Sequence, residues 1–161
     1  MRGQLGLMPF VSLQDLPASG PLLGLDPGGR RIGLASCDAR RALVSPVATL
    51  TRGRFMADAA AILAEYDSRG CVGLVIGLPL NMDGSEGPRA QSARAFGRNL
   101  LKLRDVPAAM HDERLSSVEA EDRLRAAGVR AARRGAVRDQ VAAVLILESA
   151  LARLAPGRPQ S

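Results

Sequence analysis

The chain has 161 residues, 47% of them hydrophobic, and can therefore bury one core of the size that a single domain needs. No apolar run approaches the roughly 18 residues of a membrane-spanning helix, and residues 1–20 lack the basic start and long apolar centre of a secretory signal. We therefore expect a cytoplasmic protein with no membrane partner. The 22 Lys and Arg against 16 Asp and Glu give a net charge of +6 and a pI near 10.8, which favours a polyanionic partner.

Three segments of distinct composition divide the chain. Residues 1–20 mix Gly, Pro, Ser and polar residues without a period, which predicts a flexible N-terminal extension. Residues 21–155 carry the periodic segments of one domain, and residues 156–161 form a tail. Cys37 and Cys71 are far apart and lack the paired spacing of a zinc site, so we expect two reduced, packed thiols.

The elements of the domain follow from the spacing of its apolar residues. A Pro27-Gly28-Gly29 turn joins the first two expected strands, and the continuously apolar run CVGLVI (71–76) predicts a central strand covered on both faces. The full expected order is strands at 22–25, 32–36 and 44–50, a helix at 55–66, a strand at 71–76, a loop at 77–87, a helix at 90–103, a strand at 108–111, and helices at 117–126 and 137–154.

This order predicts an α/β fold. Three consecutive strands form an antiparallel meander, and strands joined through helices run parallel, so the sheet is mixed and five-stranded with helices on both faces. The succession matches the ribonuclease H-like fold.

Three carboxylates are candidates for a metal-dependent site. Asp26 follows an apolar strand and precedes a Gly-Gly turn, and Glu113 lies just past the strand ending at His111, so both can project from strand ends. Asp139 opens the final helix, whose small-residue stripe would let it pack close to the sheet; the stripe consists of Ala142, Ala143, Ile146 and Ala150. Cleavage of phosphodiesters with two metal ions needs several converging carboxylates. Each acid alone has an ordinary alternative, as a turn former or a partner of the helix dipole.

Neighbouring residues offer alternatives to this assignment. Asp112 could bind the metal in place of Glu113 or cap the next helix. His111 is the only histidine and is expected to be structural, and Asp38 to be a turn residue.

Candidate substrate contacts fall in three places. The loop at 77–87 could present Asn81 and Ser85 to a phosphate, with a helix N-terminus nearby. Arg30 and Arg31 follow Asp26 on the hairpin. The tract from Arg123 to Arg138 holds six arginines and no acidic residue, with Arg133 and Arg134 in an expected Gly-flanked loop between two helices. A plain connecting loop and a solvated helix end are the respective alternatives.

Four ordered stretches of this sequence resemble the YqgF family. They are LLGLDPGGRRIGLASCD (22–38), VIGLPLNMDGSEGPRAQ (75–91), DERLSSVEAEDRL (112–124) and VRDQVAAVLILESAL (137–151). The resemblance implies a fold similar to ribonuclease H and to Holliday-junction resolvases, and a role in processing the 5′ end of pre-16S rRNA in the bacterial cytoplasm. Asp26, Glu113 and Asp139 match the acids of the family. The family's threonine pair appears here as Ser116 and Ser117.

The leading hypothesis is a metal-dependent endonuclease that uses Mg²⁺ or Mn²⁺ on precursor rRNA, free or in ribosomal particles, with Asp26, Glu113 and Asp139 as metal ligands. A resolvase of branched DNA and a non-catalytic RNA-binding module of the same fold are the alternatives. A phosphotransferase of the actin and hexokinase type is weaker, because such proteins need a second domain that 161 residues do not contain.

Overall fold

The computed structural model describes residues 9–114, 122–123, 125–128 and 131–155, with the backbone alone for 131–136. Its centre is a five-stranded sheet in the order β3-β2-β1-β4-β5. The strands are β1 (Leu22–Pro27), β2 (Arg31–Cys37), β3 (Val44–Thr51), β4 (Gly73–Leu78) and β5 (Ala108–Asp112). Pairing is antiparallel from β1 to β2 and from β2 to β3, and parallel from β1 to β4 and from β4 to β5. The predicted mixed α/β sheet is confirmed.

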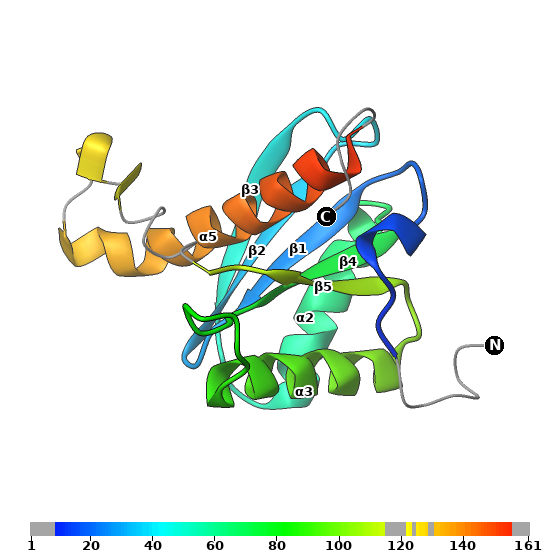
Figure 1. Ribbon diagram of the computed structural model, residues 1–161, viewed down its shortest axis with the longest axis horizontal. Coiled ribbons are helices and arrows are strands. Elements are labelled where there is room, and N and C mark those ends of the chain that lie inside the picture. Colours follow the sequence, from blue (N-terminus) through cyan, green and yellow to red (C-terminus); the bar gives the residue numbers. More distant parts are fainter. Residues whose placement is uncertain (1–8, 115–121, 124, 129–130, 156–161) are drawn as a thin grey trace.

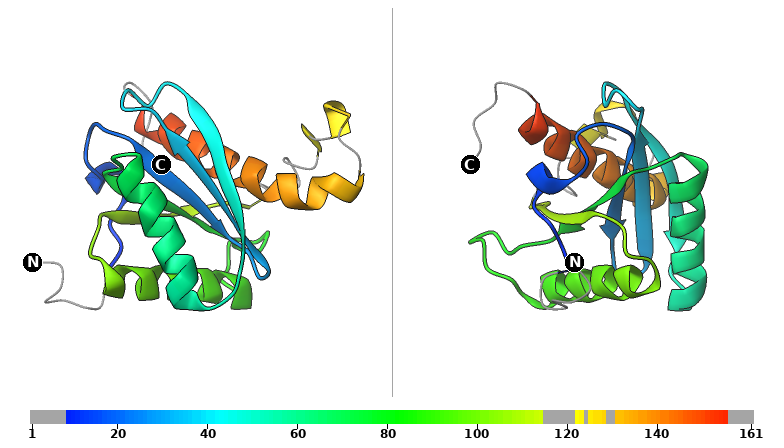
Figure 2. Two further views of the ribbon diagram at one scale, coloured as in Figure 1. Left: turned by 180° about the vertical axis from the view of Figure 1, so that it is seen from behind. Right: turned by 90° about the vertical axis from the view of Figure 1, so that its right-hand side faces the viewer.

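Helices cover both faces of this sheet (Figures 1 and 2). Helices α2 (Phe55–Ser68) and α3 (Pro88–Leu103) lie on one face, and α5 (Ala131–Leu154) crosses the other. Among the described residues, no helix is long and apolar enough to span a membrane. Cys37 and Cys71 are buried free thiols, as predicted.

Alternation along the strands sorts side chains between two cores, because successive residues of a strand point to opposite faces. Leu23 and Leu25 of β1 belong to the core under α2 and α3, and Leu22 belongs to the core under α5. Gly24 faces α5 as well, since a Cβ built there would lie 3.2 Å from Leu147 Cβ. Asp26 therefore shares the α5 face of the sheet.

The N-terminal segment differs from its prediction as a loose extension. Leu13 and Leu16, in and just after the short 3-10 helix η1 (Leu13–Asp15), are buried in the core under α5, and Phe10 packs against the opposite core. The Val11 backbone N–H also donates to the Ala108 carbonyl at 2.9 Å. Apolar side chains without a helical or strand period bury themselves here, so periodicity alone missed them; residues 1–8 lie outside the described part.

The last helix begins earlier than predicted. It starts at Ala131 and not at Val137, so Arg133 and Arg134 lie in a helix and not in a loop. A single glycine such as Gly135 costs about 1 kcal/mol in a helix and does not end one that Ala and Arg favour. Asp139 accordingly lies about two turns inside α5 and does not open it.

The prediction of a helix at 117–126 falls largely outside the described residues, as do Ser116, Ser117 and the tail 156–161. Residues 122, 123, 125 and 126 are helical, and Gly128 follows with a φ of +77°.

Candidate active site

Asp26 and Glu113 meet across β4, in the parallel part of the sheet. Asp26 lies near the end of β1, and Glu113 follows β5, held by its backbone N–H on the Leu78 carbonyl at 3.0 Å. β4 separates these strands, and its Gly77 leaves a gap: a Cβ there would lie 2.8 Å from Glu113 Oε2. The Glu113 side chain crosses this bare backbone and hydrogen-bonds to Asp26. Gly77 is thus what allows two acids from non-adjacent strands to touch.

Burial and proximity make this pair hold a proton. Burial, followed by the nearby Asp26 charge, raises the pKa of Glu113 to about 9. Burial likewise raises the pKa of Asp26, although its hydrogen bond with Glu113 opposes the rise. Protonated Glu113 therefore donates to the Asp26 carboxylate, which is the ordinary result when two buried acids share a site.

Asp139 reaches the same region from α5. The helix backbone comes so close to β2 that a Cβ at Gly33 would overlap the Asp139 carbonyl, 2.0 Å away. Gly33 is also the register partner of Asp26, so the close approach brings Asp139 beside it. Asp139 Oδ2 lies 2.7 Å from Arg31 Nε, yet the donor geometry is not that of a hydrogen bond. This buried oxygen has no hydrogen-bond partner in the described part of the chain.

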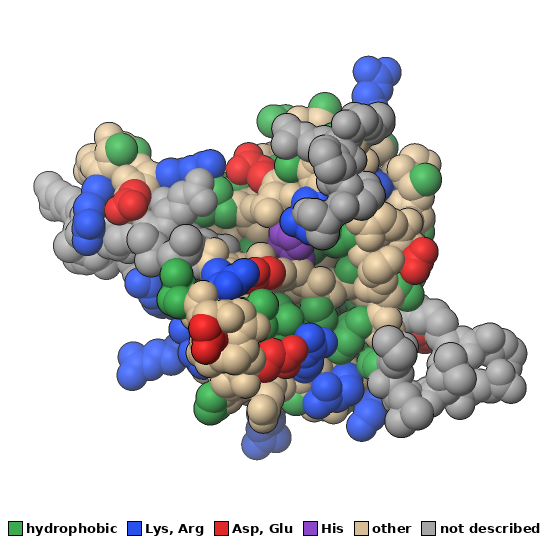
Figure 3. Space-filling model, in the orientation of Figure 1, with side chains coloured by type: hydrophobic (Ala, Val, Ile, Leu, Met, Phe, Trp, Pro, Cys, Tyr) green, Lys and Arg blue, Asp and Glu red, His purple; other side chains and the backbone are tan. Residues whose placement is uncertain are grey.

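A pocket of about 290 Å³ opens beside these acids. Its walls combine bare backbone, two carboxylates and four arginines: Asp26, Gly28, Gly29, Arg30, Arg31, Arg89, Arg138 and Asp139. Figure 3 shows further basic side chains along the lower edge of one face, over α3. The pocket offers space and positive charge for a phosphate next to the acids.

Arg89 was not predicted from the sequence. It lies in the first turn of α3, after Pro88, and its positive charge acts to lower the pKa values of both Asp26 and Glu113. The only available sign was its place in the stretch VIGLPLNMDGSEGPRAQ, because no local pattern tells which arginine will face a distant strand end.

The predicted loop contacts are arranged differently. Asn81 Nδ2 donates to Ser85 Oγ at 3.0 Å, and Ser85 Oγ donates to Asp83 at 2.6 Å, so these side chains order their own loop. Neither Asn81 nor Ser85 lines the pocket beside Asp26 and Asp139. The side chains of Arg133 and Arg134 lie outside the described part, but Arg138 of the same tract lines the pocket.

Two residues near Glu113 have other partners. Asp112 is exposed and forms an ion pair with Arg114 at 2.9 Å. His111 is buried between β5 and α5, with its Nε2 2.9 Å from Ser149 Oγ, and burial lowers its pKa. Of the two acids that follow His111, Glu113 alone is buried and bonded to Asp26, which lines the pocket.

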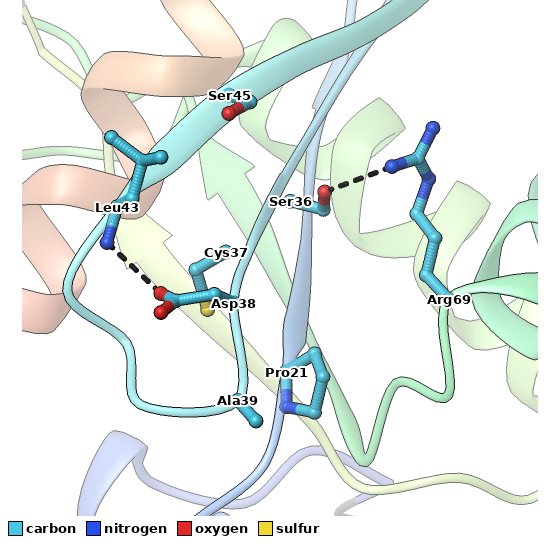
Figure 4. A pocket seen from close by; sticks show the side chains of 8 residues that line it. All are labelled: Pro21, Ser36, Cys37, Asp38, Ala39, Leu43, Ser45 and Arg69. Carbon is cyan, nitrogen blue, oxygen red and sulfur yellow. Dashed lines mark hydrogen bonds between the residues drawn. The ribbon is translucent and has the colours of Figure 1, made fainter.

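A larger pocket, of about 490 Å³, lies at the opposite end of β2 (Figure 4). Asp38 accepts hydrogen bonds there from the backbone N–H groups of Ala42 and Leu43, in keeping with the turn role predicted for it. Arg69 reaches Ser36 Oγ at 3.4 Å but also pairs with Glu65. None of the three candidate catalytic acids lines this pocket, whereas Asp26 and Asp139 line the smaller one.

The carboxylates in and beside this smaller pocket are suitable ligands for a hard divalent cation. Its oxygens are carboxylates, the ligands that Mg²⁺ and Mn²⁺ prefer. The proton shared by Asp26 and Glu113, and the Arg31 guanidinium 2.7 Å from Asp139 Oδ2, both mark places where positive charge balances these carboxylates. In their present positions no three His, Cys, Asp or Glu side chains of the described residues are grouped to hold one ion, and Asp139 lies against Arg31.

Known proteins are similar to this chain in sequence or in fold. The profile of the family described as RuvX, Holliday junction resolvase, matches residues 20–153. A relative named pre-16S rRNA nuclease from Rhodopseudomonas palustris (strain TIE-1) is 52% identical over 139 residues, covering 86% of this chain and 87% of the relative. One of the same name from Rhodospirillum rubrum is 48% identical over 158 residues, covering 95% and 98%.

Solved structures of RuvC from Thermus thermophilus share the fold. One superposes with a TM-score of 0.52 at 15% identity, covering 83% of this chain and 96% of RuvC. RuvC in complex with a Holliday junction substrate gives the same TM-score at 13% identity, covering 84% and 96%. At such identities the likeness shows the ribonuclease H-like fold alone.

Proposed function

Because the chain belongs to the RuvX family of nucleases, we propose that it cleaves precursor 16S rRNA with Asp26, Glu113 and Asp139 as its catalytic carboxylates. As a nuclease it is a hydrolase of phosphodiester bonds. The observation that carries the assignment of residues is the Asp26–Glu113 pair, joined across Gly77 in a region that also receives Asp139. The names of its relatives support rRNA as the substrate, and the proposal places the protein in the bacterial cytoplasm, on free or ribosome-bound precursor.

The proposed chemistry divides the work between acids and arginines. When bound, Mg²⁺ or Mn²⁺ would supply the Lewis acidity that activates an attacking water and neutralises charge at the leaving oxygen. Asp26, Glu113 and Asp139 would hold it, and Glu113 gives up its shared proton to do so. Arg30 and Arg89, on different walls of the pocket, donate to the non-bridging phosphate oxygens. Gly28 and Gly29 let the phosphate approach the backbone.

A second substrate is favoured by a specific finding. The family is described as Holliday junction resolvase, and RuvC has been solved with that substrate. A branched DNA duplex would use the same acids, since the reaction is the same hydrolysis. The third hypothesis, a non-catalytic RNA-binding module, requires that the acids bind no cation.

The test compares three substrates and matched variants. The full chain is incubated with a precursor 16S rRNA fragment, an unrelated single-stranded RNA and a four-way DNA junction, each with Mg²⁺, Mn²⁺ or EDTA. We expect metal-dependent cleavage of the precursor and none in EDTA. Asp26→Asn, Glu113→Gln and Asp139→Asn should each abolish it, since an amide cannot supply the charge that a cation requires.

Asp112→Asn is the matched control, because Asp112 is an exposed acid directly beside Glu113. It should cleave like the wild type. Cleavage by the Glu113 variant together with loss in the Asp112 variant would reverse the assignment of the two acids. Preferred cutting of the junction would replace the rRNA with branched DNA, and binding of the precursor without cleavage under any condition would favour the non-catalytic module.

A further inference from the structure

The ion pair between Arg31 and Asp139 joins two groups to which the proposed function gives different tasks. Arg31 is the first residue of β2, and its side chain lies on the α5 face, as Gly33 does two positions later. Its Nε lies 2.7 Å from Asp139 Oδ2, with the two side chains 33% and 16% exposed. The pair is therefore shielded from much of the solvent, where charges interact more strongly than at an open surface.

This contact and a cation ligated by Asp139 Oδ2 exclude each other. A guanidinium in contact with the carboxylate oxygen occupies the volume and the charge position of a metal ligated by that oxygen. Two positive charges a few ångströms apart in a partly buried site repel strongly. Asp139 can ligate a divalent cation through Oδ2 only when Arg31 withdraws.

The pocket provides a place for Arg31 after it withdraws. Arg31 lines the pocket together with Arg30, Arg89 and Arg138, so its guanidinium can leave Asp139 and remain inside. A phosphodiester brought there offers two anionic oxygens, which match the guanidinium fork. The substrate thus supplies the partner that Arg31 loses to the cation.

We propose that Arg31 is an exchangeable counter-ion: it neutralises Asp139 in the cation-free protein and transfers to the substrate phosphate when the cation binds. This rests on the proposed function and deepens it. The consequence is positive coupling, in which nucleic acid draws Arg31 off Asp139 and so tightens cation binding, and the cation in turn tightens nucleic-acid binding. Free cation has to displace Arg31 unaided, so the resting protein binds it weakly.

The first experiment measures Mn²⁺ binding by calorimetry without nucleic acid. Arg31→Ala should bind Mn²⁺ about tenfold more tightly than the wild type, since the competing charge is gone. Arg30→Ala is the matched control, because it removes the same charge from an exposed neighbour on the same pocket wall. It should change the affinity by about twofold at most, because exposed charges are screened. Arg31→Lys, which keeps the charge on a shorter side chain, should fall between.

The second experiment measures binding of a single-stranded RNA oligonucleotide in EDTA, where no cleavage occurs. Asp139→Asn frees Arg31 and should tighten RNA binding. Adding Arg31→Ala to Asp139→Asn should cancel most of that gain, and adding Arg98→Ala, an exposed arginine of α3 outside the pocket, should leave the gain from Asp139→Asn intact. Thermal melts of every variant confirm that it is folded before binding is compared.

A failure of the exchange gives a different result from a failure of the proposed metal site. If the wild type binds Mn²⁺, Asp139→Asn weakens it and Arg31→Ala leaves it unchanged, the exchange is refuted while the metal site stands. An equal gain from Arg30→Ala and Arg31→Ala would reduce the effect to general electrostatics and refute it as well. If neither the wild type nor Arg31→Ala binds Mn²⁺, the exchange and the proposed metal site fail together.

Discussion

Gly33→Ala tests whether the close approach of α5 to β2 sets the position of Asp139. An added Cβ would lie 2.0 Å from the Asp139 carbonyl oxygen, and ordinary contact begins at 3.4 Å. The helix must therefore retreat by about 1.4 Å at that point, since both obstacles are backbone and neither a strand nor a helix interior yields easily. Asp139 would move away from Asp26 by a similar distance.

Two magnitudes follow from this displacement. Overpacking of this kind costs about 1–3 kcal/mol of stability. For a domain of this size each kcal/mol lowers the Tm by about 2–4 °C. A shift of about 1 Å in a catalytic group can lower the rate about 100-fold. We therefore expect a folded variant with a modestly lower Tm and a much larger loss of cleavage.

The assay pairs thermal melting with single-turnover cleavage of the precursor rRNA in Mg²⁺. Gly53→Ala is the control, because a Cβ at Gly53 has nothing within 4 Å, and it should match the wild type in both measurements. Wild-type cleavage by Gly33→Ala would show that the site does not depend on this approach. A loss of cleavage that disappears when the variant is assayed well below its Tm would mean that stability alone was affected.

Three further predictions concern charge. The pKa of Glu113 is about 9 in the folded, cation-free protein and about 4.5 in the unfolded chain, so the unfolding free energy should fall as pH rises between these values, by at most about 1.4 kcal/mol per pH unit. Urea denaturation in EDTA measures this dependence, and the same dependence on pH in Glu113→Gln would contradict the prediction. Arg89→Ala should weaken precursor binding and cleavage about tenfold, whereas Arg98→Ala, on the same helix but outside the pocket, should not. Equal effects of the two substitutions would mean that Arg89 does not contact the substrate phosphate. Replacing Arg133 and Arg134 together by Ala should reduce by about 1.4 the slope of the logarithm of the RNA-binding constant against the logarithm of the salt concentration, measured with single-stranded RNA. Turnover at saturating substrate should stay intact, and an unchanged slope would mean that the tract is a solvated helix surface.

The order of elements was predictable because hydrophobic spacing is a local property. The apolar run at 71–76 identified the central strand, and the small-residue stripe of the last helix is buried as expected, with Ala142, Ala143 and Ala150 fully enclosed. Where prediction failed, the reason was physical. Phe10 and Leu16 bury without any period, and the favourable residues around Gly135 carry the helix through it.

The candidate acids were predicted as strand-end and helix residues, and their catalytic role stays a prediction. The sequence alone determined their types, the places of Asp26 and Glu113 after apolar strands and of Asp139 on the final helix, and the α/β class of the sheet. Their mutual distances depended on bare backbone at Gly33 and Gly77, which admits α5 to β2 and lets Glu113 cross β4 to Asp26. The same packing directed Arg31 onto Asp139 and Arg89 into the pocket. Only the tertiary structure could decide these contacts, because they join segments far apart in the chain, and local periodicity reports which face a residue takes but not how closely two backbones approach.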